Sequence, residues 1–247
     1  MSTAQDSHWK SLPLGKGVEL IAADANGLAA FNKPAGILSH PNKAGEEVRS
    51  LLNAPYALDG EFYQVAGGRR IWLLNRLDSA TSGVILLTAS ENLAKIIREL
   101  FKGKTVYKSY YAVVFGKPQK ATELWRDRLA IEKKAGQIRT STGHIPSESN
   151  MKLSKSWSTS SGTVSLIQLE PRTGRSHQLR VQCATRHLPI IGDQTYGDFN
   201  KNKLFTKSTG SKRLFLHSYE TKFTYQYVGK PHVFSVKAEI PAEFTLS

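Results

Sequence analysis

The sequence predicts an α+β protein with one domain and a central, mostly antiparallel mixed sheet. Three observations support this fold class. Strand-like apolar segments outnumber helix-like ones, and few strands alternate regularly with helices, as a repeating βαβ sheet would require. No repeat of fixed period and no domain linker is apparent, and 247 residues fit one large domain or two small ones. We predict a loosely held arm over residues 1–17 and one domain over 18–247.

The first elements of the domain are two short strands, expected at 18–24 and 27–32. The turn between them contains Asn26 and Gly27, a pair typical of tight hairpins. Residues 46–54 follow with the pattern of a short helix. This helix must end before Pro55, because a residue that precedes proline avoids the helical conformation.

Two buried strands, 71–74 and 83–88, are predicted on either side of a polar loop. The clearest helix follows at 91–102, where apolar residues recur at the spacing of one helix face and Ser90 provides an N-terminal cap. Strands are then expected at 106–116, 124–131 and 163–170. The lysine- and serine-rich stretch 132–162 predicts exposed loops or a ragged hairpin. A turn and helix over 174–187 and strands at 214–223 and 232–238 complete the domain.

The charge balance points to an anionic partner. Lys and Arg number 34 and Asp and Glu number 20, which leaves a net charge of +14. Composition alone allows nucleic acid, a membrane surface or an acidic protein. No apolar run approaches the ~18–20 residues that cross a bilayer, and the first residues lack a signal-peptide core. Cys183 is the single cysteine, so an internal disulfide and a thiolate metal cluster are excluded. We predict a cytoplasmic protein.

Asp78 is the first candidate for chemistry. It lies in L-N-R-L-D-S-A-T-S-G, residues 74–83, between two apolar strands that can hold a carboxylate rigidly for nucleophilic or acid–base work. The same letters also suit a structural turn, because an aspartate followed by Ser, Thr and Gly often bonds its own backbone. The local pattern leaves both interpretations open.

A second segment, E-P-R-T-G-R-S-H-Q-L-R, places Arg172, Arg175, His177 and Arg180 around a glycine turn. Guanidinium groups there can bind phosphate or hold a buried carboxylate ionised. A solvated basic face is the alternative. In K-S-Y-Y-A, residues 108–112, strand alternation sends the two tyrosines to opposite faces, so one packs inside and the other is free to stack on a base. An aromatic strand residue is otherwise core.

Together these segments resemble the RluA-type RNA pseudouridine synthases. NKPAGILSHP, NRLDSATSGVILL, VYKSYYAVV, PRTGRSHQLRV, HLPIIGDQTYG and LFLHSYETKF occur in the family's order, over about residues 18–244. The resemblance implies the family's catalytic domain, with helices and loops flanking the sheet and a cleft across it. Only about 17 residues precede the match, so we expect no accessory RNA-binding domain before it.

The resemblance also implies roles for single residues. Asp78 corresponds to the essential aspartate, Tyr110 to the tyrosine that packs against the target uracil, and Arg180 to the arginine that pairs with the catalytic carboxylate. Arg76 corresponds to the arginine that fills the place of the extruded nucleotide. Asn75 stands where the family usually has histidine, and we expect altered RNA contacts there. Further RNA contacts are expected from Arg172, Arg175 and His177.

The implied reaction needs no cofactor and no metal. It cleaves the bond between uracil nitrogen and ribose, rotates the base and rejoins it through carbon, and a carboxylate can assist by attack or by charge stabilisation. The expected partner is RNA, a stem-loop of rRNA or tRNA, with no membrane and with the chain as a monomer. Substrate choice is assigned to the stretches 132–162 and 200–213.

Three other functions are weighed against this one. A non-catalytic RNA-binding protein or RNA chaperone on the same scaffold would share the charge and the fold, but it does not need Asp78, Tyr110 and Arg180 together. A ribonuclease using His177 or His217 leaves Asp78 unexplained. A methyltransferase is disfavoured because no glycine-rich strand–turn–helix is apparent.

Overall fold

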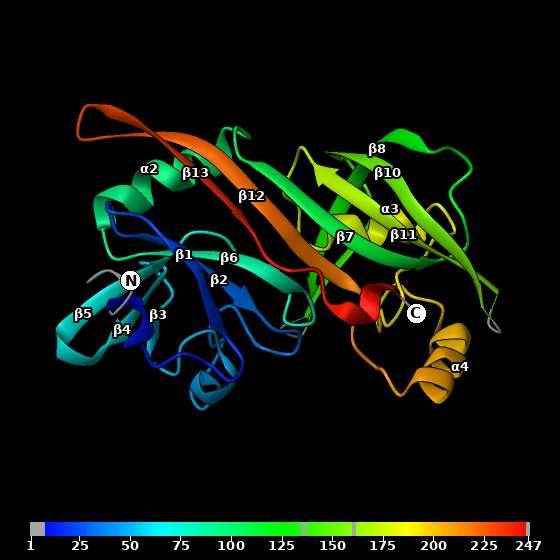
Figure 1. Ribbon diagram of the computed structural model, residues 1–247, viewed down its shortest axis with the longest axis horizontal. Helices are drawn as coiled ribbons and strands as arrows, with labels where there is room; N and C mark the ends of the chain where they lie inside the picture. The colour runs from blue at the N-terminus through cyan, green and yellow to red at the C-terminus, as the bar shows by residue number, and fades with distance from the viewer. Residues whose placement is uncertain (1–7, 135–136, 160–161, 246–247) are drawn as a thin grey trace. The chain divides into compact units, whose positions relative to one another are not determined.

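A computed structural model describes residues 8–134, 137–159 and 162–245, which form two compact units (Figure 1). Unit 1 comprises 1–107 and 218–239, and unit 2 comprises 108–217 and 240–247. The chain therefore passes from one unit to the other three times. Because both units are discontinuous in sequence, neither is bounded by a single linker, which explains why none is visible in the sequence.

Unit 1 is built on antiparallel strands (Figure 1). Strands β3, β4, β5, β6 and β12 are neighbours in that order; β2 also pairs with β6, β1 pairs with β2, and β13 pairs with β12. The bounds are β1 Glu19–Ala23, β2 Leu28–Lys33, β3 Tyr56–Ala57, β4 Phe62–Val65, β5 Arg69–Leu73, β6 Ser82–Thr88, β12 Leu216–Tyr227 and β13 Lys230–Lys237.

Strand β6 is the centre of unit 1, and all seven of its residues are buried. Helix α2, Glu91–Lys102, follows it and buries Leu93, Ala94 and Ile97 in the core shared with β2, β5, β6, β12 and β13. Ser90 caps this helix, since its hydroxyl accepts a hydrogen bond from the Leu93 N–H at 3.3 Å. The predicted strands 71–74 and 83–88 and the predicted helix 91–102 are confirmed.

Unit 2 contains a second run of antiparallel strands, in the order β7, β11, β10, β8, β9. The bounds are β7 Tyr107–Phe115, β8 Thr122–Lys134, β9 Gln137–Thr142, β10 Ile145–Thr159, β11 Gly162–Pro171, α3 Gln178–Ala184 and α4 Phe199–Thr209. The described residues also contain short 3₁₀ turns at Glu47–Arg49, Ala66–Gly68 and Ala242–Thr245.

Of the two structures predicted for 132–162, exposed loops are wrong and a hairpin is closer, because long antiparallel strands cover most of this stretch. In β10 the inward-facing positions include Ser147, Ser149 and Met151, and all three are at most 1% exposed. Serine is tolerated there because its hydroxyl finds a partner: Ser149 donates to the Gln182 carboxamide at 2.7 Å. Small polar residues on the buried face conceal the alternation that identifies a strand.

Several other predictions need correction. The helix expected at 46–54 is only the 3₁₀ turn Glu47–Arg49, and the helix expected over 174–187 is limited to Gln178–Ala184. Helix α4 was not predicted, although Asp198 caps it and Gly210 ends it with a φ of 75°. The described part of the predicted loose arm is in fact held in place, since Trp9 is 1% exposed.

Gly83 lies in a position that only glycine accepts. Its φ is +109°, and a Cβ atom there would stand 2.1 Å from the backbone oxygen of Ser218 in β12. The absence of a side chain therefore allows β12 to lie close against the start of β6. This position follows the Asp78 loop directly, so the close approach also determines where that loop ends.

We predict that Gly83→Ala destabilises the protein by about 3 kcal/mol or more, because backbone strain and a steric clash coincide. Gly229→Ala serves as the matched control. It has a φ of +71° with nothing within 4 Å, and it should cost only about 1 kcal/mol. Urea unfolding of both variants measures the difference, and equal losses would contradict the clash.

Candidate active site

The candidate residues fall into two groups, one in each unit. Unit 1 contains Asn75, Arg76 and Asp78 in the loop from β5 to β6. Leu74 and Leu77 anchor this loop, because both side chains are buried. Between and after these anchors, Arg76 is exposed and Asp78 is half-buried. The loop therefore presents its charged residues outward from two apolar fixed points.

A buried lysine holds the Asp78 loop from one side. The side chain of Lys33, at the end of β2, is 0% exposed. Its ammonium group donates to the backbone oxygens of Pro34 at 3.1 Å, Ile37 at 2.7 Å and Ser79 at 3.0 Å. The Gly36 N–H also donates to the Ser79 oxygen, at 2.7 Å. Two hydrogen bonds thus connect Ser79, the residue after Asp78, to the segment NKPAGILS.

Ser39 fixes the residue before Asp78. Its hydroxyl donates to the Leu77 backbone oxygen at 2.7 Å and accepts from the Leu77 N–H at 3.0 Å. The Ser39 backbone oxygen accepts in turn from the hydroxyl of Tyr63, a fully buried residue of β4, at 2.6 Å. Because the backbone is held on both sides of Asp78, its carboxylate has little freedom to move away.

Asn75 has a structural bond in addition to its predicted contact with RNA. Its side-chain oxygen accepts a hydrogen bond from the Leu86 N–H of β6 at 2.8 Å, and the Leu86 oxygen accepts from the Leu74 N–H at 3.0 Å. Asparagine therefore continues the pairing of the two strands for one more step into the loop. A contact of Asn75 with RNA stays a prediction.

In unit 2, Tyr110 lies on β7 opposite Leu169 of β11. The sequence predicted that one of the two adjacent tyrosines is packed inside and the other is free. This is wrong, because Tyr110 and Tyr111 are both half-buried. Lys108 lies two residues before Tyr110 and therefore on the same face of the strand.

Arg180 belongs to a buried ion pair on α3. Its Nε and Nη2 atoms each donate to an oxygen of Asp193 at 2.8 Å, and the two side chains are 9% and 1% exposed. The guanidinium also stacks on Tyr196 at 5.1 Å. Two backbone N–H groups, of Thr195 and Tyr196, donate to the same carboxylate. The orientation of the Arg180 fork is therefore fixed within its own unit.

The environment of Asp193 keeps its carboxyl group ionised. Burial alone would raise its pKa, but the hydrogen bond and charge of Arg180 and the two backbone N–H donors together hold the pKa below its ordinary value. Asp193 was not among the predicted site residues, although it lies in the family-like segment HLPIIGDQTYG. Nothing in that segment alone distinguishes a buried partner of arginine from an exposed turn aspartate.

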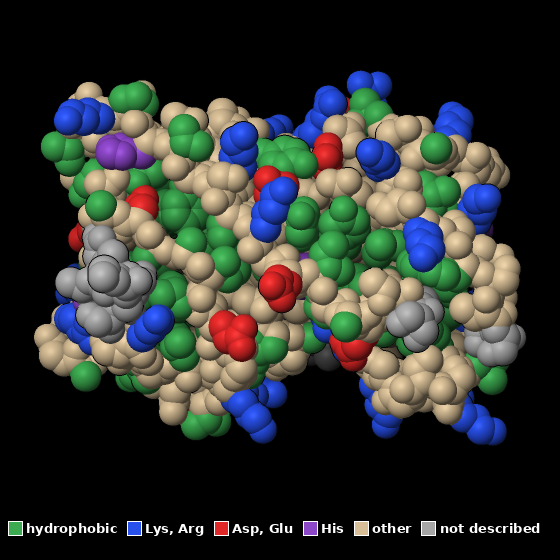
Figure 2. All heavy atoms as spheres, viewed as in Figure 1, with side chains coloured by type: hydrophobic (Ala, Val, Ile, Leu, Met, Phe, Trp, Pro, Cys, Tyr) green, Lys and Arg blue, Asp and Glu red, His purple; other side chains and the backbone are tan. Residues whose placement is uncertain are grey.

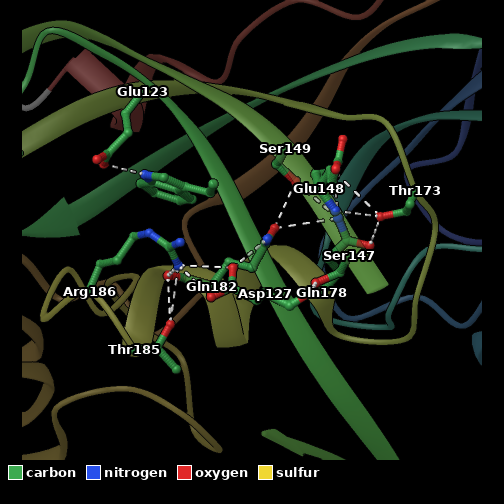
Figure 3. A network of polar contacts seen from close by, with 11 residues as sticks. Glu123, Asp127, Ser147, Glu148, Ser149, Thr173, Gln178, Gln182, Thr185 and Arg186 are labelled. Atoms are coloured by element: carbon green, nitrogen blue, oxygen red, sulfur yellow. Dashed lines mark hydrogen bonds and ion pairs between the residues drawn. The ribbon is translucent and has the colours of Figure 1, made fainter. Parts of the chain in front are cut away.

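The glycine turn before α3 is held by a network of uncharged groups (Figure 3). The Gln178 side-chain oxygen accepts from the Thr173 hydroxyl at 2.7 Å and from the Arg175 N–H at 3.1 Å. Its nitrogen donates to the Glu148 backbone oxygen and the Ser149 hydroxyl, both at 3.0 Å. One buried carboxamide thus ties the turn to β10.

The remaining candidates around this turn differ in exposure. Arg172 is exposed, whereas Arg175 and His177 are half-buried. The His177 ring nitrogen Nδ1 lies 2.8 Å from the Tyr196 hydroxyl, so this ring belongs to the surroundings of Arg180. His217 is 1% exposed, which does not suit the accessible acid or base that a ribonuclease requires.

The positive charge does not gather into one patch on the face shown in Figure 2, where Lys and Arg side chains are dispersed. Within the described residues, no group of three His, Cys, Asp or Glu side chains could hold a metal ion. The described helices include none that is long and apolar enough to span a membrane. Local geometry, rather than overall charge, therefore identifies the site.

Comparison with known proteins places the chain in a family. The sequence model of the RNA pseudouridylate synthases matches residues 27–185, so the chain belongs to that family. A tRNA pseudouridine synthase C of Vibrio vulnificus is 33% identical over 223 residues, which cover 85% of this chain and 86% of that protein. A ribosomal large subunit pseudouridine synthase C of the same organism is 29% identical over 214 residues, which cover 86% of this chain and 64% of that protein.

Solved structures share the fold. Human RNA pseudouridylate synthase domain containing 1 matches with a TM-score of 0.70 and 20% identity, covering 92% of this chain and 84% of that one. Domain containing 4 matches with a TM-score of 0.66 and 22% identity, over 92% and 90%. The predicted family and the predicted α+β fold class are thereby confirmed, and the chain is an RNA pseudouridine synthase by family.

We predict that Asp193→Asn lowers the free energy of unfolding by about 3 kcal/mol at pH 7, because Arg180 loses its charged partner while buried. The pKa of Asp193 is lowered by folding, so its stabilisation is present above the unfolded value of about 4 and is lost as pH falls through the folded pKa. The gap between wild type and variant should therefore shrink in acid.

Denaturant unfolding at pH 7 and at about pH 3 measures this gap. Asp59→Asn, at an exposed aspartate, is the control and should change little at either pH. A gap that stays constant with pH would show that the Asp193 charge is not what stabilises the protein.

Proposed function

We propose that the chain isomerises uridine to pseudouridine in tRNA and that the carboxylate of Asp78 performs the chemistry. The observation that carries the catalytic assignment is the fixation of the backbone on both sides of Asp78. Lys33 and Gly36 bind the oxygen of the next residue, and Ser39 binds the residue before it. A structural turn aspartate would not need a buried ammonium group to position it, whereas a preorganised catalytic carboxylate benefits from one.

The reaction balances without any added reagent. The bond between N1 of uracil and C1′ of ribose breaks, and a bond between C5 and C1′ forms. The proton on C5 leaves, and N1 gains a proton, so no net oxidation or reduction occurs. An ionised carboxylate can attack the sugar, attack the base, or stabilise the cationic sugar. The proposal requires only that Asp78 is ionised beside the target nucleotide.

The other residues keep the roles that the family resemblance implies. Tyr110 packs against the target uracil, and its half-buried ring on β7 is consistent with a stacking surface. Arg180 supports the reaction as a permanently charged group whose orientation Asp193 fixes. Arg76 is exposed, as a side chain must be to fill the place of an extruded nucleotide.

Further contacts with RNA are assigned to Asn75, Arg172, Arg175 and His177. Arg172 is exposed and suits the phosphate backbone. Substrate choice is assigned to the stretches 132–162 and 200–213, which contain the end of β8, β9, β10 and most of α4. Residues 135–136 and 160–161 lie outside the described residues. We also propose that the chain acts as a monomer in the cytoplasm.

The choice of tRNA over rRNA rests on the relatives. The protein named as a tRNA enzyme is 33% identical and is covered over 86% of its length. The protein named as a ribosomal enzyme is 29% identical and is covered over only 64% of its length. The present chain thus matches the tRNA enzyme over more of its length, and this favours a tRNA uridine.

We predict that Asp78→Asn lowers the rate of pseudouridine formation by about 10³-fold or more, because the amide cannot act as a nucleophile or base. Tritium release from uridine labelled at C5 measures the rate, and RNA binding should change little. Asp59→Asn is the control and should keep full activity. Equal activity of Asp78→Asn and wild type would remove Asp78 from the mechanism.

We predict that a pseudouridine in tRNA disappears when the gene is deleted and returns only with an active copy. Sequencing-based mapping across tRNA and rRNA tests this, with wild type and Asp78→Asn as complementing copies. A lost site in rRNA alone would contradict the tRNA assignment. If no site changes in any RNA, the chain is a non-catalytic RNA-binding protein on this scaffold.

A further inference from the structure

Lys108 is a half-buried cation that has no acidic partner in the described part of the chain. The structure gives its ammonium group no hydrogen bond and no ion pair within the described residues. Burial lowers its pKa, and no neighbouring carboxylate counters this effect. Placing a charged group in such a position costs free energy unless a partner compensates for it. An anion from outside the described residues would therefore stabilise the Lys108 ammonium group.

The ammonium group of Lys108 lies against the glycine turn before α3. A Cβ atom at Gly174 would stand 3.7 Å from the Lys108 Nζ, the nearest heavy atom to that position. The bare Cα of Gly174 thus forms one wall beside the ammonium. This contact brings the start of β7 and the T-G-R turn together within unit 2.

Arg175, the next residue, contributes a second group without a partner. Its Nε atom is buried and has no hydrogen-bond acceptor among the described residues. Its backbone N–H is held by Gln178, which is itself bonded to Thr173 and β10 (Figure 3). A guanidinium donor and an ammonium donor are therefore held near one rigid turn, with no acid assigned to either.

The position along β7 suggests which anion binds here. Lys108 and Tyr110 lie on the same strand face, roughly 7 Å apart along the chain. Under the proposed function Tyr110 packs against the target uracil, so Lys108 lies within about one nucleotide of it. The anion at this distance from a bound base is a phosphate of the same RNA strand. Ammonium and guanidinium groups are the usual partners of phosphate oxygens.

We propose that Lys108 and Arg175, both next to Gly174, form a phosphate-binding site for the RNA backbone next to the target uridine. This inference rests on the proposed function, because it uses Tyr110 as the place of the uracil. The site holds the strand by charge and does not read its sequence. It converts an unfavourable buried charge of the free protein into affinity for the substrate.

The first test is Lys108→Met in the full chain, with a tRNA transcript that contains the target uridine. The dissociation constant should rise roughly tenfold, as expected for a lost hydrogen-bonded charge contact. The slope of log affinity against log salt should fall by about one phosphate contact. Arg175→Gln should weaken RNA binding in the same way. The double variant should lose less binding free energy than the sum of the two single losses, because both side chains bind one phosphate.

Lys117→Met is the matched control, because Lys117 is exposed and follows the far end of the same strand. Its affinity and salt slope should equal those of wild type. Stability provides the second readout. Lys108→Met should unfold at equal or higher denaturant concentration than wild type, since it removes a desolvated charge. A loss of stability that parallels the loss of affinity would reduce Lys108 to a structural role and overturn the proposal.

A neutral methylphosphonate, placed in turn at each linkage flanking the modified uridine, locates the phosphate. At one linkage the methylphosphonate should reduce the RNA affinity of the wild-type protein about as much as Lys108→Met does. The same substitution should not change the affinity of the Lys108→Met variant. If no linkage behaves in this way, or if Lys108→Met binds RNA like wild type, no RNA phosphate occupies the site. If wild type converts no uridine in any RNA, the proposed function fails and this inference fails with it.

Discussion

The ammonium group of Lys33 is the interaction on which the Asp78 loop depends. It is fully buried, and it binds three backbone oxygens, two in its own segment and one beside Asp78. A buried charge is stable only when its donors are satisfied, so the geometry of the surrounding carbonyls and the position of the loop determine one another. Ser39 and the close approach of β6 to β12 at Gly83 further restrict the Asp78 loop.

Unit 2 also holds a charged candidate residue in place, but through different contacts. Arg180 is held by a buried carboxylate and an aromatic ring, and the neighbouring turn is held by the carboxamide of Gln178. In both units the charged candidates lie on short segments between regular elements, and groups deeper in the protein fix those segments. Fixation of this kind reduces the motion that a reacting group would otherwise lose on binding its substrate.

Strong local patterns in the sequence were reliable. The all-apolar run of β6, the single apolar face of α2 and the Ser90 cap each determine structure within a few residues. The long regular strands of region 132–162 could not be predicted, because β10 buries serines whose partners come from α3 and β8. Local pattern analysis counts a serine as exposed, and only a distant partner makes it an interior residue.

The sequence by itself determined the family, the α+β class and the candidacy of Asp78, Tyr110 and Arg180, because six ordered motifs identify them together. Only the tertiary structure decided how these residues are held. Lys33, Asp193 and Gln178 act through contacts with residues 46, 13 and 30 positions away in the sequence. Long-range contacts of this kind depend on how strands and helices pack, and no local spacing of residue types encodes them.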